Sequence, residues 1–102
     1  MLISYNTEIL RDVCFQHSIA VKHFGENIAI SLQARHSDIQ AASNVFELLV
    51  GRISIDGNLC TLTMPDFLSI EMTPNYAFAE RGSFYDWSTV GRVKLMRIND
   101  VE

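Results

Sequence analysis

The stretch from Arg52 to Met64, RISIDGNLCTLTM, decides the fold class of this chain. Residues 52–55 and residues 59–64 both alternate between apolar and polar side chains, which is the pattern of a half-buried β-strand. Asp56 and Gly57 lie between the two runs and are typical of a tight turn. The residues on one face of the second run are all apolar: Cys60, Leu62 and Met64. The stretch therefore predicts an antiparallel hairpin with one apolar face.

Two more strands are expected after this hairpin. Pro65-Asp66 is a second turn signal, and the alternation resumes from Phe67 to Met72. Residues 92–98 form a final run of strand-forming residues. The intervening residues 73–89 are richer in turn formers and are expected to form a loop. Together these segments predict a small antiparallel sheet.

Helices are expected before the hairpin. Residues 2–5 form a short apolar segment that predicts a first strand, and residues 8–15 repeat their apolar positions at helical spacing. A longer helical stripe follows, with Gly25 inside it marking a kink or a close helix crossing. The stripe consists of Val21, Phe24, Ile28, Leu32, Arg35 and Ile39.

This order of elements predicts an α+β fold, with an N-terminal strand and a helical hairpin packed on one face of the antiparallel sheet. We expect a core in which helix residues cover the apolar sheet face, because that pairing removes both surfaces from water. The helix residues expected in it are Phe24, Ile28 and Leu32, and the sheet residues are Leu62 and Ile70. The chain has 102 residues, which is enough for a single domain, 1–102, and too few for two.

The composition excludes several classes of protein. Hydrophobic residues make up 48% of the chain and charged residues 20%, as in ordinary globular proteins. No apolar run approaches the roughly 20 residues of a membrane-spanning helix, and the first residues lack the features of a signal peptide. We therefore expect a cytoplasmic protein with no membrane partner. The net charge of −4 argues against tight binding of nucleic acid, which usually requires an excess of basic residues.

Neither a metal nor a cofactor is expected. Cys14 and Cys60 form no CxxC or Cys/His cluster, so we expect two small buried hydrophobic residues. His17, His23 and His36 lie in or beside the predicted helices at spacings that present no metal pair. The sequence also contains no Gly-rich phosphate loop and no Ser/His/Asp order.

The strongest local feature is a cluster of cations in the last predicted strand: Arg92, Lys94 and Arg97. On a regular strand the first two share a face and the third points to the other face. Two interpretations remain open, namely charges that protect an edge strand from aggregation and a basic patch that meets RNA phosphates or an acidic partner. Three aromatic residues just upstream could stack on bases, fill an interface or cap the end of the sheet: Phe84, Tyr85 and Trp87.

Several stretches, taken in order, resemble one known family. Leu10-Arg11-Asp12-Val13-Cys14 is similar to a Leu-Arg-Asp-Leu-Cys segment of that family, and residues 34–42 are similar to its Ala-Arg-Leu-Ser-Asp-Leu-x-Ala-Ala. Residues 86–90 resemble its Asp-Trp-Ser-x-Val entry into a last strand, which here is residues 92–98. The family is the plasmid-maintenance killer-protein (HigB-like) branch of the RelE/ParE toxin superfamily. The similarity spans nearly the whole chain and is weakest between residues 52 and 83.

The resemblance implies a RelE/ParE-like fold and a role as the toxin component of a bacterial type II toxin–antitoxin system. Such a toxin inhibits growth through translation or mRNA cleavage and is neutralised by a cognate antitoxin of helix-turn-helix type. The members that cut mRNA on the ribosome use basic side chains to orient the ribose hydroxyl and to neutralise developing charge. The candidate phosphate-facing residues here are Arg52, Arg92, Lys94 and Arg97, and Arg81 lies in a loop that could close over them.

The chain also departs from the family pattern, which leaves its status as an enzyme open. Relatives usually have a Gly/Asn-Tyr-Arg segment in the central hairpin, whereas residues 65–69 contain no arginine. The common C-terminal Asp-Tyr-His is replaced by Asn99-Asp100-Val101-Glu102. The alternative is a catalytically degenerate, non-enzymatic interaction module of the same fold that binds a regulator or host target. We also expect an exposed apolar groove that an antitoxin segment covers, because so short a chain has difficulty burying all its apolar surface.

Overall fold

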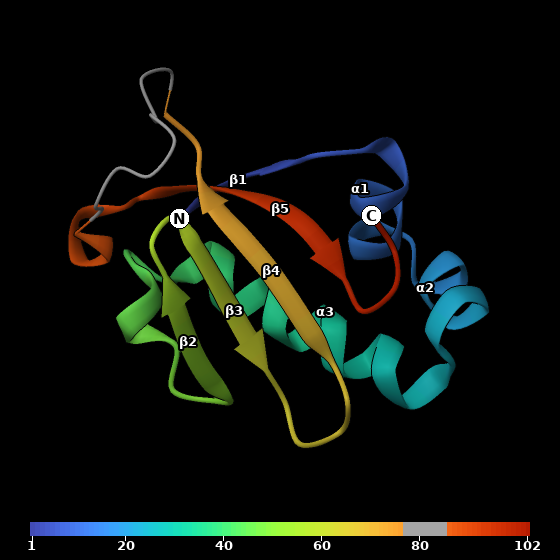
Figure 1. Ribbon diagram of the computed structural model, residues 1–102. Helices are drawn as coiled ribbons and strands as arrows, with labels where there is room; N and C mark the ends of the chain where they lie inside the picture. The colour runs from blue at the N-terminus through green and yellow to red at the C-terminus, as the bar shows by residue number, and fades with distance from the viewer. Residues whose placement is uncertain (77–85) are drawn as a thin grey trace.

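A layer of helices packs on one face of a twisted sheet in the computed structural model of the protein (Figure 1). The structure describes residues 1–76 and 86–102. The α-helices within those residues are α1 (Glu8–Phe15), α2 (His17–Phe24) and α3 (Glu26–Ala41). The strands within them are β1 (Leu2–Tyr5), β2 (Arg52–Asp56), β3 (Leu59–Thr63), β4 (Ser69–Pro74) and β5 (Arg92–Ile98). Two short 3-10 helices, η1 (Val45–Glu47) and η2 (Trp87–Thr89), precede β2 and β5 respectively.

The described strands form one sheet in the order β1-β5-β4-β3-β2. The predicted antiparallel meander is confirmed for β2 to β5. The prediction of a wholly antiparallel sheet is wrong at the other edge, because β1 pairs with β5 in parallel, from Leu2 opposite Arg92 to Tyr5 opposite Leu95. No tight turn joins these two strands, so nothing in the chain imposes the antiparallel pairing of a hairpin on them.

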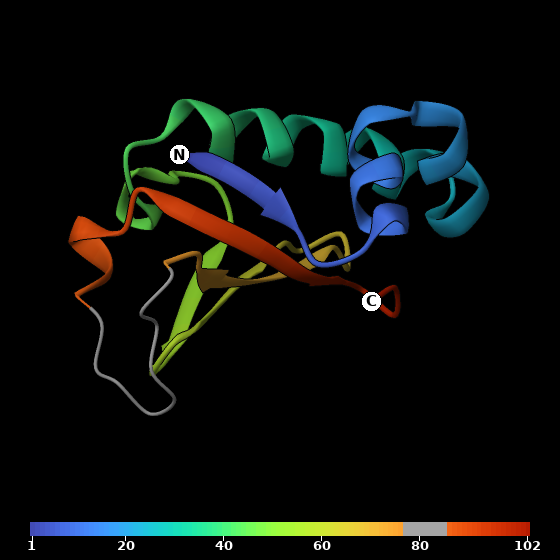
Figure 2. The same cartoon turned by 90° about the horizontal axis from the view of Figure 1, so that it is seen from above.

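The helical part consists of three α-helices in the described residues rather than a two-helix hairpin. Gln16 separates α1 from α2, and Gly25 separates α2 from α3. Gly25 has a φ of 85°, a conformation that favours glycine, so the break expected at this position is confirmed. Figure 2 shows α3 running along one face of the sheet, while no described helix covers the opposite face. We call that uncovered side the open face.

The core lies between α3 and the helix-side face of the sheet. Leu32, Leu62 and Ile70 are all buried, as predicted. Phe24 and Ile28 pack against this core but are only partly buried, so the prediction is confirmed only in part for them. The reason is geometric: α2 and its junction with α3 lie beyond the end of the sheet, where less of the sheet is available to cover them (Figure 1).

Candidate functional site

The cation-rich strand β5 lies between β1 and β4, so it is not an edge strand. The interpretation of its charges as protection of an exposed edge is therefore wrong. The two edges of the described sheet are β1 and β2. On β5 the side chains that face the helices are Val93, Leu95 and Ile98, all buried. The charged side chains of β5 consequently lie on the open face.

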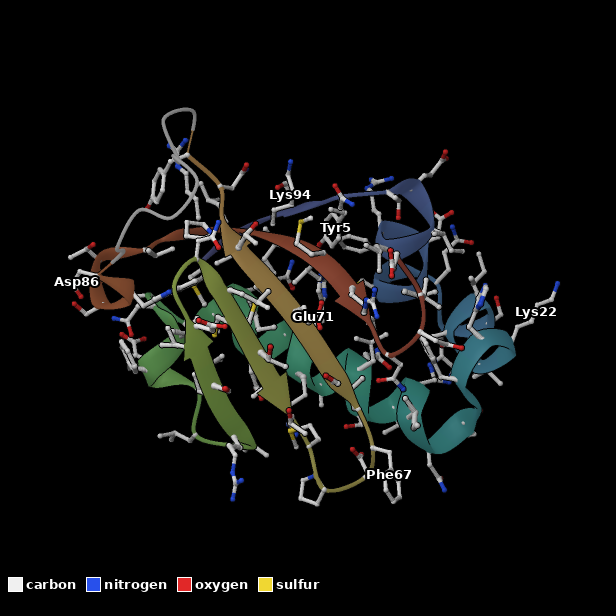
Figure 3. The ribbon with its side chains drawn as sticks, in the orientation of Figure 1. Tyr5, Lys22, Phe67, Glu71, Asp86 and Lys94 are labelled. Atoms are coloured by element: carbon white, nitrogen blue, oxygen red, sulfur yellow. The ribbon has the colours of Figure 1, made fainter. Side chains whose placement is uncertain are left out.

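Arg97 lies on the same face as Lys94, against the expectation for a regular strand. Met72 of β4 is opposite Leu95, but Glu71 is opposite Arg97, so β5 carries one extra residue, Met96, at a β-bulge. The bulge reverses the alternation and returns Arg97 to the open face. Lys94 and Glu71 are labelled on this face in Figure 3. Arg92, Lys94 and Arg97 therefore form a single row.

Arg97 is already paired with two carboxylates. Its Nε lies 3.8 Å from a carboxylate oxygen of Glu71, and its Nη2 donates to Glu102. Two carboxylates thus surround one guanidinium, and an incoming anion would have to displace them. Glu71 and Glu102 are the residues that sequence reasoning missed, because neither a bulge nor a cross-strand pair has a signal in the local sequence pattern.

The four predicted cations do not converge on one point. Arg52 is on β2, with β3 and β4 between it and β5. Three strand spacings put it about 14 Å from the β5 row. Arg92 and Lys94 are about 7 Å apart along their strand, and neither has an ion-pair partner in the part of the chain that the structure describes. Of the predicted site residues that the structure describes, these two alone lie next to each other and have no ion-pair partner. Arg81, the proposed lid cation, lies outside the described residues.

The indole ring of Trp87 packs inside the fold and is not exposed for stacking on bases. Its side chain is buried, and its Nε1 donates a 2.9 Å hydrogen bond to the carbonyl oxygen of Gly57 in the β2–β3 turn. Asp86 caps η2 by accepting hydrogen bonds from the backbone nitrogen and the hydroxyl of Ser88. The two other predicted aromatic residues, Phe84 and Tyr85, lie outside the described residues.

A cavity of about 470 Å³ opens where the hairpin β2–β3 meets the segments that flank it. It lies between the chain entering β2 and the chain leaving β3, and its lining residues are Val50, Gly51, Arg52, Thr63, Met64 and Pro65. Leu49 and Phe67, next to the lining segments in the chain, are 93% and 86% exposed. The cavity and these side chains match the expectation of an exposed apolar surface, whose location sequence reasoning did not give.

Tyr5 and His36 form a half-buried polar pair between β1 and α3. The Tyr5 hydroxyl lies 2.7 Å from Nε2 of His36, and the ring of Phe15 packs edge-on against both. Burial raises the pKa of Tyr5 to about 12, so the phenol stays protonated and is able to donate to the neutral imidazole. Burial also lowers the pKa of His36 below its ordinary value of 6.5. Both groups are therefore neutral at pH 7, which suits a packing role.

The two thiols are free and buried. Burial raises the pKa of Cys14 to about 12 and that of Cys60 to about 11. A thiol at these values is almost entirely protonated at pH 7 and is a poor nucleophile. The prediction of two small buried hydrophobic residues is confirmed.

Residues 1–76 and 86–102 contain no group of three His, Cys, Asp or Glu side chains placed to hold a metal ion. None of the helices in these residues is long and apolar enough to cross a membrane. No protein-family model, curated protein or solved structure matches the chain.

Proposed function

We propose that this chain is the toxin-family component of a type II toxin–antitoxin pair, with a RelE/ParE-like fold of the HigB-like branch. The observation that carries the proposal is where the resembling stretches lie in the fold. Each of them includes residues that are buried, hydrogen-bonded or ion-paired in the fold.

Three stretches support this point. Leu10, Val13 and Cys14 of the first stretch are buried on the inner face of α1. In the stretch at the end of α3, Ile39 is buried in the core, and Arg35 pairs with Asp38 at 2.9 Å within the helix. The Asp-Trp-Ser stretch forms η2 and ties it to the β2–β3 turn through Trp87. The resemblance is therefore carried by residues that shape the fold.

The cations favour protein binding over RNA cleavage as the activity. Cleavage of a phosphodiester needs preorganised positive charge within hydrogen-bonding distance of one phosphate. Arg97 is paired with Glu71 and Glu102, and Arg52 lies across the sheet, so among the candidate cations in residues 1–76 and 86–102 only Arg92 and Lys94 are adjacent and unpaired. The net charge of −4 adds no long-range attraction for RNA. We accordingly propose that the chain acts as the non-enzymatic, catalytically degenerate variant of its fold.

The antitoxin is proposed to cover the cavity at residues 50–52 and 63–65. Its walls are mostly apolar, and Arg52 supplies one cation at the rim. An apolar side chain of the antitoxin, flanked by an acidic residue, is the ligand that such a site fits. Covering Leu49 and Phe67 at the same time would remove two highly exposed apolar side chains from water.

The test is inducible expression of the chain with and without the product of the adjacent open reading frame. We expect growth inhibition that co-expression relieves, and a stable complex on gel filtration. Val50→Asp, inside the cavity, should weaken the complex, whereas Ile30→Asp, at an exposed aliphatic residue of α3, should not. Two separate peaks at micromolar concentration, or equal effects of the two variants, would contradict the proposal.

Mapping of mRNA 5′ ends after induction distinguishes mRNA cleavage from non-enzymatic binding. We expect no new ends. The appearance of new ends that are lost in the double variant Arg92→Gln/Lys94→Gln would establish the nuclease and exclude the non-enzymatic proposal. In that case the loss of two cations should slow cleavage by at least about 100-fold.

A further inference from the structure

Strand β2 is a free edge of the sheet. It pairs with β3 on one side, and none of the described strands lies on its other side. Arg52, Ser54, Ile55 and Asp56 are all exposed. Its central residues, Ile53 to Ile55, include none of the lysine or proline residues that usually keep an open edge from pairing with another strand.

The hairpin fixes which backbone groups of β2 are free. Gly57 and Asn58 form a two-residue turn, so Asp56 and Leu59 on either side of it exchange backbone hydrogen bonds. The bonding then alternates along an antiparallel pair, so Ser54 also bonds to β3. The N–H and C=O groups of Ile53 and Ile55 therefore point away from β3, toward the free edge.

We propose that this edge pairs with β2 of a second copy of the chain, in an antiparallel arrangement with its two-fold axis at Ser54. In this register Ile53 of one copy lies opposite Ile55 of the other. These are the residues whose backbone groups point outward, so each such pair is able to exchange two hydrogen bonds. The two sheets become one continuous sheet, with the helices of both copies on the same side.

Charge complementarity favours a second copy of the chain as the partner of the β2 edge. Arg52 at the start of β2 and Asp56 at its end are both exposed. The proposed register places Arg52 of each copy directly opposite Asp56 of the other, so the ion pair forms twice. Registers shifted by two residues, centred on Ile53 or Ile55, place Arg52 or Asp56 opposite Ser54 instead. A strand with one charge of each sign at its ends is complementary to its own antiparallel copy.

Apolar surface beside the edge supports the same occupant. Ile53 and Ile55 point to the helix side of the sheet, and Ile55 is 40% exposed because no neighbouring strand covers it. Opposite isoleucines from two copies would cover one another across the new strand pair. Phe46 of η1 and Val50, two residues before β2, are exposed as well. The pairing does not depend on the chain being a toxin-family domain.

The experiment is sedimentation equilibrium of the full chain up to millimolar concentration. We expect a dimer, and we expect Arg52→Asp and Asp56→Arg, each alone, to weaken it by about tenfold or more, since each turns two attractive pairs into repulsive ones. The double variant Arg52→Asp/Asp56→Arg restores opposite charges and should recover the dimer. Asp100→Arg is the control for Asp56→Arg, with the same change in charge at an exposed site outside β2. Circular dichroism checks that every variant is folded.

Hydrogen exchange identifies the strand at the interface. The amides of Ile53 and Ile55 should become protected as the concentration rises, while the amide of Ser54 should be protected in monomer and dimer alike. Ile55→Thr, which changes no charge and keeps a β-branched residue, should weaken the dimer. A monomer at all concentrations would overturn the proposal. So would a dimer that is indifferent to these variants, or protection of Ile53 and Ile55 that appears only when a different protein is added.

Discussion

The indole Nε1 of Trp87 and the carbonyl oxygen of Gly57 are joined by a 2.9 Å hydrogen bond that ties the entry of β5 to the turn between β2 and β3. The two residues are 30 positions apart in the chain. The bond therefore joins the turn between β2 and β3 to the segment before β5, at the end of the sheet where β4 ends and β5 begins. Removing this hydrogen bond tests how much it contributes to the stability of the fold.

Replacing Trp87 should separate the contribution of this bond from that of burial. Trp87→Phe keeps most of the buried apolar surface and loses the donor, so we expect the free energy of unfolding to fall by about 1 kcal/mol. Trp87→Ala also empties the site, and should lower it by about 3–5 kcal/mol. Urea denaturation measures both. Equal losses for the two variants would mean that the packing of the indole contributes nothing.

Leu32→Ala should lower the free energy of unfolding by about 2–5 kcal/mol, because the side chain is 1% exposed and its removal leaves a cavity against the sheet. The matched control is Ile30→Ala on the same helix, where the side chain is 54% exposed. A surface substitution of this kind should change stability by under about 0.5 kcal/mol. The assignment of the α3 face that packs on the sheet is refuted if the two variants unfold at the same denaturant concentration.

Gly51→Ala should be destabilising because of close packing at the cavity. A Cβ there would lie 2.5 Å from Sδ of Met64 and 2.9 Å from Cδ1 of Leu62. Gly25→Ala is the control, since both glycines have a positive φ but Gly25 has no atom within 4 Å of the added carbon. We expect the Gly51 variant to lose about 1–3 kcal/mol more than the Gly25 variant, which represents the cost of overpacking. Thermal unfolding of the two variants side by side provides the comparison.

Stability should decrease as the pH falls below neutral, because of His36. Its pKa is lowered by burial in the folded chain from the ordinary 6.5 that it regains on unfolding. The unfolded chain therefore binds the proton first as the pH falls, which favours unfolding between 6.5 and the lower pKa of the folded state. The slope from one such group is at most about 1.4 kcal/mol per pH unit.

The check on this prediction is a series of urea unfolding curves between pH 7.5 and pH 5, a range chosen to span roughly one unit on each side of an unperturbed histidine. His36→Gln should flatten the pH dependence in this window. A parent chain with constant stability across the window would show that His36 does not titrate differently in the two states.

The local sequence determined the elements of this protein. The alternation in residues 52–64 predicted β2, β3 and the turn at Gly57, and the last strand was predicted as residues 92–98, the bounds that β5 has. These features depend on the period of the side chains and on the conformational freedom of glycine, both of which are properties of a few neighbouring residues. Leu32, Leu62 and Ile70 were assigned to the core for the same reason.

The tertiary structure alone decided which cations are available. A one-residue bulge at Met96 turns Arg97 to the open face, where Glu71 and Glu102 neutralise it. The sheet order places Arg52 on the far edge and makes β5 an inner strand. Register and strand order depend on pairings between residues far apart in the chain, whose side chains meet only after the sheet has formed. The residues of one strand do not indicate which strands pair with it. The sequence therefore predicts where the cations lie in the chain, but not which carboxylates and strands lie beside them.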